Sequence, residues 1–533
     1  MLRFWQNPEF VRHRRAELRR NRALAVLLVV LVVCVLIGLI CWASRESQME
    51  AMRRWAVEYN RPERLAEAEG AYLKEIWRSL YRSLMLAQAG ILTFWSLLAC
   101  AQSVSGERDR RTWDFQRTTR LTPAELLIGK LIGEPVLAYF IVLCCFPVAL
   151  VAAIGAGISP GNFLSAYALI ILGALFIGLV GLWLSSLLES RSRGVGLIGS
   201  LAMFALFALS FNIAESNFPG FAAFSPLSGL LPALGMLPPA PERFAAIFGH
   251  RVPWLLASLM VYLTFGAWLV VMLLRNLKRD YEGMRLLSRW QALGCAAFLN
   301  FMLYVFFYPM PTNVWMQDMI VPTIHVTARM FALSVIAFNT MVLFAIGLTT
   351  LAPYERLKLW GRGRAAGKES LFSEEGLSWP WLALSAVIAY GLLVWGLLAR
   401  RGTLGFDRSV IAASALQLFT VLLFVTGDVL FIQWCRLTRM RAPLLKGVLY
   451  LGLYYAGAIV VTALTAAVRS EAGARAVSHL LLPASAFDDS IAGFYAPWNT
   501  VLGWALQCGF IAVMIAAITR RVQGSAAALA AGD

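Results

Sequence analysis

The sequence predicts an all-α integral membrane protein, and three observations support that class. Hydrophobic residues make up 59% of the chain and charged residues only 14%. Apolar runs long enough to cross a bilayer recur along the whole chain. The formal net charge of +17 gathers mostly in connectors on one side of the predicted membrane. That distribution is typical of a cytoplasmic face, and it argues against a nucleic-acid partner.

The apolar runs predict about twelve transmembrane helices. With the N-terminus inside, the even-numbered connectors are cytoplasmic, as are both chain ends, in the inner (cytoplasmic) membrane. The run at 126–155 contains Pro135 and Pro147 and predicts a tilted or kinked helix. The runs lie at 23–43, 83–104, 126–155, 163–188, 195–213, 252–274, 290–309, 327–351, 380–399, 409–434, 444–468 and 499–519.

The connector at 44–82 is the exception to the charge rule. Its eight basic residues are balanced by seven glutamates, and its portion RPERLAEAEGAYLKEIWRSL, residues 61–80, predicts a surface helix on the outside.

The twelve runs divide into two sets of six with the same arrangement. Each half opens with a basic segment, carries a cytoplasmic connector between its second and third spans, and ends with a long outer loop before its last span. We therefore predict two units, 23–274 and 275–533, as a parallel repeat of the kind found in transporters. An accidental even division is the alternative.

Residues 1–22 predict an amphipathic helix at the cytoplasmic membrane surface. Phe4, Trp5, Phe10 and Leu18 can face the acyl boundary while the arginines meet anionic headgroups.

The connector SGERDRRTWDFQRTTRLTPAELLIGK, residues 105–130, is unusually long and charged. Thr122, Pro123 and Glu125 form a helix-start signature, with an N-cap, a proline at the first helical position and an acidic first turn. A solvated basic turn is the alternative. The candidate coupling residues in the connector are Glu107, Arg108, Arg110, Arg111, Thr112, Trp113, Leu121, Thr122, Pro123 and Glu125.

The order of residue types in this connector, from Gly-Glu-Arg through Leu-Thr-Pro to Leu-Leu-Ile-Gly-Lys, resembles the coupling segment of type-2 ABC transporter permeases. The opening Asn7-Pro8-Glu9-Phe10-Val11-Arg12 resembles the start of the same family, although His13 and Arg14 stand where Glu-Leu is commoner. The resemblance covers about residues 1–275 and is weak beyond.

The resemblance implies the permease subunit of an ABC exporter, with no enzymatic activity or cofactor of its own. A separate ATP-binding subunit, in two copies per complex, would bind ATP and Mg. Residues 105–126 would be the coupling segment, with 121–126 as the short helix that seats in the ATPase.

The second connector, 352–379, repeats the first only loosely. Glu355, Arg356, Lys358 and Trp360 are its candidate coupling residues, but it lacks the Leu-Thr-Pro block, and GRGRAAGKE looks flexible. We therefore expect a homodimer, or a pair with a related permease, in preference to one chain that binds two ATPase subunits.

The outer loops 214–251 and 469–498 are apolar but broken by proline and glycine. The family resemblance implies re-entrant helices there that close an outer gate, with Phe224, Pro226, Pro483 and Phe487 as candidates. A loop lying on the membrane interface is the alternative.

Other function classes fit less well. The stretch from Gly361 to Lys368 combines glycines with a lysine as a phosphate-binding loop does, but the spacing of these residues is wrong. We therefore expect no ATPase in this chain. Few ionisable residues lie in the spans, which disfavours a secondary transporter: we expect Lys130 to pair with Glu134 at i,i+4, and Asp428 to be a packed polar contact. No outer loop gathers a catalytic set, which disfavours a membrane-embedded enzyme or assembly factor. The cargo cannot be read from the fold class.

The remaining small or sulfur-bearing residues read as packing elements. Gly129 and Gly133 form a GxxxG pair suited to close helix contact. The eight cysteines lie in or beside apolar runs without metal-ligand spacing.

Overall fold

The structure is a computed structural model of the chain. It describes residues 6–59, 62–118, 120–187, 230, 234, 244–247, 250–277, 286–307, 336, 339–351, 354–370, 372–373, 376–399, 408–438, 443–468, 471–483 and 498–530.

The described chain forms two compact units. The first contains α1 (Pro8–Glu17), α2 (Arg20–Glu58), α3 (Pro62–Asp109), α4 (Trp113–Thr118), α5 (Pro123–Gly133), α6 (Val136–Ala156), α7 (Pro160–Leu187) and α11 (Trp254–Asn276). The second contains α12 (Arg289–Phe307), α14 (Tyr354–Ala365), α15 (Trp379–Ala399), α16 (Arg408–Leu437), α17 (Pro443–Val468), α18 (Glu471–Leu481) and α19 (Trp498–Ala530).

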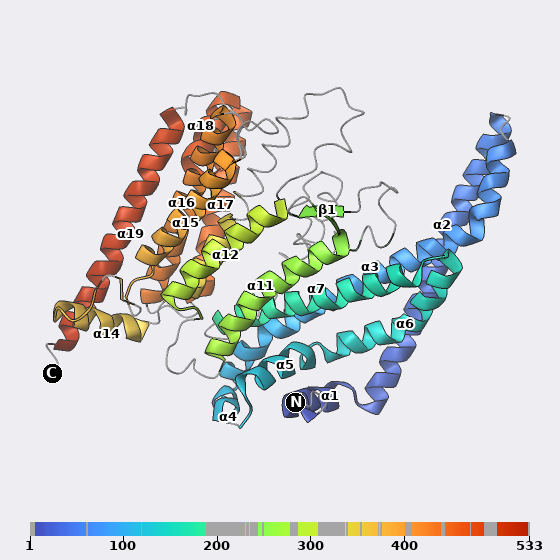
Figure 1. Ribbon diagram of the computed structural model, residues 1–533, viewed down its shortest axis with the longest axis horizontal. Helices are drawn as coiled ribbons and strands as arrows, with labels where there is room; N and C mark the ends of the chain where they lie inside the picture. The colour runs from blue at the N-terminus through green and yellow to red at the C-terminus, as the bar shows by residue number, and fades with distance from the viewer. Residues whose placement is uncertain are drawn as a thin grey trace. The chain divides into compact units, whose positions relative to one another are not determined.

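The predicted helical membrane class is confirmed, with one small correction. Before α11 the chain forms two four-residue strands, β1 (Phe244–Ile247) and β2 (His250–Pro253), which pair as a two-stranded sheet. The described residues are otherwise organised as helices and their connections (Figure 1).

Nine helices of the described chain are long and apolar enough to cross a membrane. They correspond to nine of the twelve predicted runs. Of the other three, 195–213 lies outside the described residues, 327–351 is described mainly as the shorter apolar helix Asn339–Thr349, and 290–309 forms α12, which is not among the nine. The count of twelve and its division into two sets of six stay predictions.

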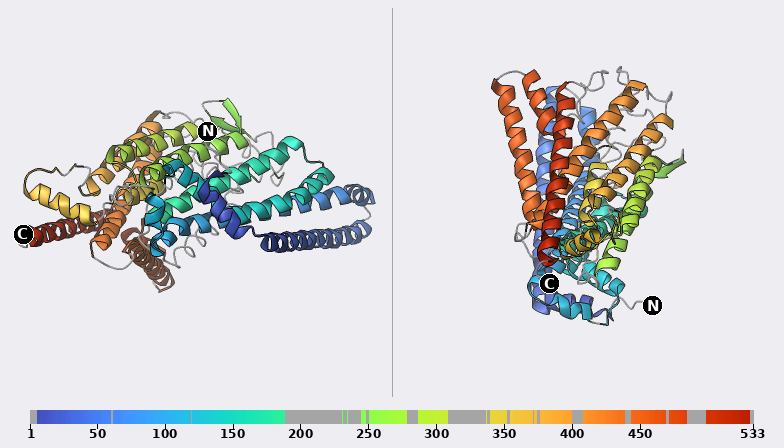
Figure 2. Two further views of the ribbon diagram at one scale, coloured as in Figure 1. Left: turned by 90° about the horizontal axis from the view of Figure 1, so that it is seen from below. Right: turned by 90° about the vertical axis from the view of Figure 1, so that its left-hand side faces the viewer.

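The surface helix predicted at 61–80 is not a separate helix, because residues 62–80 are the first part of α3. The connector 44–82 is made of the adjoining ends of α2 and α3, which have 39 and 48 residues. At 1.5 Å per residue these helices are about 58 and 72 Å long, roughly twice the ~30 Å apolar core of a bilayer. The α2–α3 hairpin therefore extends past the ends of α6 and α7 (Figure 2).

Salt bridges hold the two helices of this hairpin together. Arg45 binds Glu75 at 2.9 Å, and Arg53 lies 3.5 Å from Glu69. The apolar side chains Cys34, Cys41, Met49 and Ala56 of α2 are buried at intervals of seven or eight residues, a spacing typical of a helix seam that faces a partner helix.

The long run at 126–155 is two helices instead of one kinked helix. α5 ends at Gly133 and α6 begins at Val136, with Pro135 at the N-cap. The ring of Pro135 removes a backbone donor and crowds the preceding turn, so the chain breaks there. Pro147 lies within α6, which continues through it.

The core of the first unit lies between α2, α3, α6 and α7. Its fully buried residues include Tyr81, Leu92, Ala149, Ala166 and Ala174. α1, α4 and α5 lie together at one end of the unit, away from the hairpin tip (Figure 1). We call the end of the unit that contains α1, α4 and α5 the α4 end, and the end that contains the tip of the α2–α3 hairpin the hairpin end.

Within the second unit, α14 packs on α19 near the end of α16. Leu357 and Trp360 of α14 are buried with Leu430, Leu437 and Ile518. α18 lies between α17 and α19, which both contact it.

Candidate functional site

The α4 end is built on a tight turn at the end of α3. The amide of Thr112 donates to the carbonyl of Glu107 at 3.0 Å, and the amide of Arg111 donates to that of Arg108 at 3.1 Å. These two bonds form a Schellman motif, in which the C′ residue adopts the left-handed conformation and is usually glycine. Here Arg111 takes that place with φ of 56°. The turn directs the chain into α4.

The short helix α4 presents two different sides. Trp113 and Gln116 are buried, at 3% and 6% exposure, and Gln116 donates to Glu107 at 2.6 Å. Phe115 on the opposite side is 74% exposed, and Arg110, Arg111 and Thr112 before it are exposed as well. The structure therefore holds α4 through Trp113 and Gln116 and leaves Phe115 exposed in the same segment as the exposed Arg110 and Arg111.

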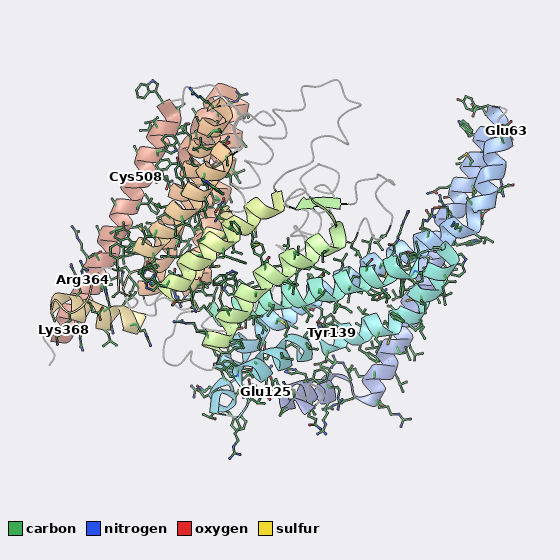
Figure 3. The ribbon with its side chains drawn as sticks, in the orientation of Figure 1. Glu63, Glu125, Tyr139, Arg364, Lys368 and Cys508 are labelled. Carbon is green, nitrogen blue, oxygen red and sulfur yellow. The ribbon has the colours of Figure 1, made fainter. Side chains whose placement is uncertain are left out.

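α5 begins as the sequence predicts. The Thr122 hydroxyl accepts from the amide of Glu125 at 3.2 Å, and the Glu125 carboxylate accepts from the amide of Thr122 at 2.8 Å, which completes a capping box with Pro123 at the first turn. Glu125 is labelled at this end in Figure 3. The short helix expected at 121–126 is thus the beginning of an 11-residue helix, and the separate short helix of the connector is α4.

Beneath α4 lies a cluster of four charged residues, which we call the ion cluster: Glu9, Arg12, Glu107 and Lys130. Lys130 Nζ lies 2.6 Å from Glu107 Oε2 and 3.3 Å from Glu9 Oε1. Arg12 Nη2 lies 2.8 Å from Glu107 Oε1 and 2.7 Å from Glu9 Oε1. The cluster joins α1, α3 and α5, and Gln116 connects α4 to it.

The i,i+4 pair expected between Lys130 and Glu134 is wrong. Lys130 is fully buried and its ammonium is shared by Glu9 and Glu107. It also lies over the ring of Trp113, 5.5 Å from the centroid. Glu134, at the end of α5, instead faces His13 at 3.6 Å. Local sequence spacing did not anticipate this because both partners of Lys130 are distant in the chain.

α1 is seated on α5 through small residues and an N-cap. A Cβ added to Gly129 would lie 2.7 Å from Glu9 Cβ, and one added to Gly133 would lie 3.2 Å from His13. The predicted close contact at this GxxxG pair is therefore confirmed, with α1 as the partner. Asn7 caps α1 and also donates to the carbonyl of Glu125 at 2.6 Å.

The prediction that Phe10 faces lipid is wrong. Its side chain is 5% exposed because α1 packs on α5 and α6. Phe4 and Trp5 lie outside the described residues, and Leu18 is half-buried.

The charges around Glu9 keep it ionised. Burial alone would raise its pKa, but the hydrogen bond to His13 and the positive charges of Lys130 and Arg12 outweigh that effect and lower the pKa to about 2. The pKa of Arg12 is raised despite its own burial, chiefly by its hydrogen bond to Glu107. Glu9 and Arg12 are therefore both charged near neutral pH.

The structure places the predicted coupling residues in two layers. Arg110, Arg111, Thr112 and Thr122 are exposed, whereas Arg108, Leu121, Pro123 and Glu125 are half-buried. Glu107 and Trp113 are buried and support α4 from inside. The sequence reading did not single out Phe115 or the ion cluster. The sequence feature that could have indicated the ion cluster is the position of Glu107 and Lys130 at the ends of apolar runs, where an unpaired charge is costly.

The second connector forms an ordered helix instead of a flexible segment. α14 continues through Gly361 and Gly363, and it ends where Gly367 adopts φ of 72° while the Lys368 amide donates to the Gly363 carbonyl at 2.8 Å. Arg364 and Lys368 mark this end in Figure 3.

The candidate coupling residues of the second connector are not all on its surface. Trp360 is buried and donates to the Ser370 carbonyl at 3.1 Å, while Arg356 and Lys358 are half-buried. The side chain of Glu355 lies outside the described residues.

The outer-gate candidates are mostly outside the described residues, namely Phe224, Pro226 and Phe487; Pro483 follows α18 and is half-buried. Two described residues of the 214–251 loop, Leu230 and Leu234, are fully buried in the core of the first unit. Arg82 of α3 donates to the Leu234 carbonyl at 3.1 Å.

In the second unit, Asp428 of α16 makes the polar contact expected of it. It accepts a 2.8 Å hydrogen bond from Tyr455 of α17. No cluster of three or more potential metal ligands occurs in the described part of the chain.

Comparison with known proteins identifies a family domain in the first part of the chain. Residues 10–236 match the family model of the ABC-2 type transporter. The matched region is an ABC-2 type transporter membrane domain. The match includes α4, α5 and all of α1 except Pro8 and Glu9, so three of the four ion-cluster residues, Arg12, Glu107 and Lys130, lie within it. Searches of curated proteins and of solved structures found no match.

Proposed function

We propose that this permease is a subunit of an ABC exporter in the inner (cytoplasmic) membrane, with both chain ends in the cytoplasm. A separate ATP-binding subunit, in two copies, binds ATP and Mg and hydrolyses the ATP. The observation that carries the proposal is the surface of α4, where Phe115 is 74% exposed beside Arg110 and Arg111.

This surface suits a protein partner. A phenylalanine exposed to water gains about 1.5–3 kcal/mol when a partner buries it. The adjacent guanidinium groups favour a partner whose apolar groove has an acidic rim, and they add orientation through bidentate bonds to carboxylates. We infer that α4, with the turn at Arg111, is the element that the ATP-binding subunit contacts.

The ion cluster supports transmission of movement from this contact. A push on α4 acts on Glu107 through Gln116, on α5 through Lys130, and on α1 through Arg12. Because breaking the buried contacts of Lys130 with Glu9 and Glu107 costs several kcal/mol, α1, α3 and α5 move together, and the Gln116 hydrogen bond links α4 to them. The displacement then reaches the membrane through α3 and through α6, which follows α5.

The test is co-purification with the ATP-binding subunit. Phe115→Ala and the double variant Arg110→Glu/Arg111→Glu should each release the ATPase while the permease stays folded in the membrane. The matched control is Arg356→Glu/Lys358→Glu in α14, which should release less because that connector lacks the Leu-Thr-Pro block. Undiminished ATPase on both α4 variants would contradict the proposal.

A further inference from the structure

One face of α3 carries a row of buried polar side chains, which we call the polar row: Tyr81, Gln88, Ser96 and Ser103. Their spacing of seven, eight and seven residues places them on the same side of the helix. Their exposures are 0%, 1%, 1% and 4%. At 1.5 Å per residue the row is about 33 Å long, close to the ~30 Å apolar core of a bilayer.

The row faces the neighbouring helices, and its hydrogen bonds are incomplete. Gln88 accepts from the Tyr167 hydroxyl of α7 at 3.0 Å, and the Tyr139 hydroxyl of α6 lies beside Ser96; Tyr139 is labelled in Figure 3. Among the described residues, the hydroxyls of Tyr81 and Ser103 have no hydrogen-bond partner. A buried hydroxyl without a partner costs about 1–3 kcal/mol, so a purely structural interior would not favour two of them on one face.

No charged residue lies along the row from Gln88 to Ser103. α6 and α7 contain no Asp, Glu, Lys or Arg, and α3 contains none between Ser83 and Ser103. The nearest charges in these helices lie at the two ends of the row: Arg82 directly follows Tyr81 at the hairpin end, and the ion cluster lies at the α4 end. Between the polar side chains, the same face carries Met85 and Leu92, which are fully buried.

We propose that the polar row is the route by which cargo crosses the first unit, and that the cargo is a neutral amphiphile with hydroxyl or amide groups on an apolar body. The alternation of hydroxyl or amide side chains with Met85 and Leu92 offers such a molecule both hydrogen bonds and apolar contact. A charged cargo would find no counter-charge over a bilayer's thickness, which is costly in an apolar interior. This inference rests on the proposed exporter function.

The route is closed in this structure by α7. A Cβ on Gly181 would lie 2.8 Å from the Leu97 carbonyl oxygen, and one on Gly178 would lie 2.8 Å from Leu131 Cδ1. Near Gly181, α3 and α7 therefore meet almost backbone to backbone. Passage of cargo requires α7 to move away from α3. Movement of the ion cluster can separate the two helices, because Glu107 of α3 belongs to the cluster.

The experiment measures thiol labelling along α3 in a variant without native cysteines, reconstituted with its ATP-binding subunit. Single Gln88→Cys, Ser96→Cys and Ser103→Cys variants are treated during ATP turnover with a neutral hydroxyethyl methanethiosulfonate. The controls are Ile91→Cys and Phe94→Cys, which lie on the exposed side of the same helix segment at 39% and 41% exposure.

We expect the row positions to react at least about tenfold faster than the two controls, because only the thiolate reacts and it forms only where water reaches. The trimethylammonium reagent of similar size should react much more slowly at Ser96→Cys. Ser96→Cys and Ser103→Cys change only oxygen to sulfur, so these variants keep the test usable if Gln88→Cys fails to fold.

Two outcomes would overturn the polar row and leave the exporter function standing. In the first, the complex hydrolyses ATP but the row positions stay as unreactive as the controls. In the second, the cationic reagent labels Ser96→Cys as fast as the neutral one, which would remove the neutral cargo class. If the parent protein fails to retain an ATP-binding subunit, the proposed function fails as well, and that result is seen before any labelling.

Discussion

Lys130 Nζ and Glu107 Oε2 lie 2.6 Å apart although 23 residues separate them in the chain. The turn at Arg111, the helix α4 and the first two turns of α5 all lie between them. Because the lysine is fully buried, this pair fixes the position of every element in between.

Removing the ammonium should destabilise the first unit strongly. Lys130→Met leaves the carboxylates of Glu107 and Glu9 buried with one cation fewer, and breaking a buried pair costs about 3–5 kcal/mol. Adding Glu107→Gln should restore part of that loss because fewer uncompensated charges remain. Thermal unfolding of the detergent-solubilised protein measures both effects. Equal melting temperatures for Lys130→Met and the parent would refute the role of the pair.

The stabilisation by Glu9 should depend on pH in a defined window. Its pKa is lowered from 4.5 to about 2 in the folded protein. A carboxyl group with a lowered folded pKa stabilises fully above the unfolded value and loses that effect as the pH falls toward the folded value. The melting temperature of the parent should therefore exceed that of Glu9→Gln by a constant amount from pH 7 to about pH 5. This difference should shrink progressively as the pH falls from about 4.5 toward about 2. A gap that already narrows between pH 7 and pH 5 would contradict this assignment.

A side chain at Gly129 should detach α1. A Cβ there meets Glu9 Cβ at 2.7 Å and Asn7 Oδ1 at 2.9 Å, and valine adds two more carbons. We expect Gly129→Val to increase trypsin cleavage after the arginines of α1 severalfold in permeabilised vesicles. Gly106→Ala, where a Cβ meets nothing within 4 Å, is the control and should cleave as the parent does. Identical cleavage of both variants would show that α1 is not held by this contact.

The orientation in the membrane can be tested with two single cysteines in a background without native cysteines. Gly70→Cys lies in open space on the α2–α3 hairpin, and Leu359→Cys replaces a side chain of α14 that is 64% exposed. A membrane-impermeant maleimide added outside should label the first, whereas the second should react only after lysis. Labelling of Leu359→Cys in intact cells would place the second connector on the wrong side.

The number of permease chains per complex follows from the difference between the two connectors. The first has the exposed Phe115, whereas α14 buries Trp360 and lacks the Leu-Thr-Pro block. We therefore expect two permease chains with two ATP-binding subunits, in keeping with the frequency of closed two-fold dimers. Mass measurement of the solubilised complex tests this, and one 58.9 kDa chain per two ATPase subunits would exclude it.

Local patterns predicted the local features well. The capping box at Thr122 and Glu125 and the apolar runs of nine helices depend on neighbouring residues, so the sequence alone was enough to anticipate them. The break at Pro135 was foreseen as a kink, because a proline signals a disturbed helix but not whether the helix resumes.

Features that depend on distant residues were missed. The partners of Lys130 come from α1 and α3, and nothing at i±3 or i±4 of the lysine indicates them. The burial of Phe10 was missed for the same reason, since a face that suits lipid also suits α5 and α6. The exposure of Phe115 depends on the turn at Arg111, a left-handed arginine where glycine is the usual residue.

α3 runs without a break from Pro62 at the hairpin tip to Asp109 at the α4 end, through 48 residues. An α-helix resists bending along its axis, so such an element behaves mechanically as a lever about 72 Å long. Its two ends are about two bilayer core thicknesses apart, and a tilt of only a few degrees at the α4 end displaces the tip by several ångströms. An antibody fragment or crosslinker that holds the tip would accordingly stall the cycle at the far end, without touching either nucleotide or cargo.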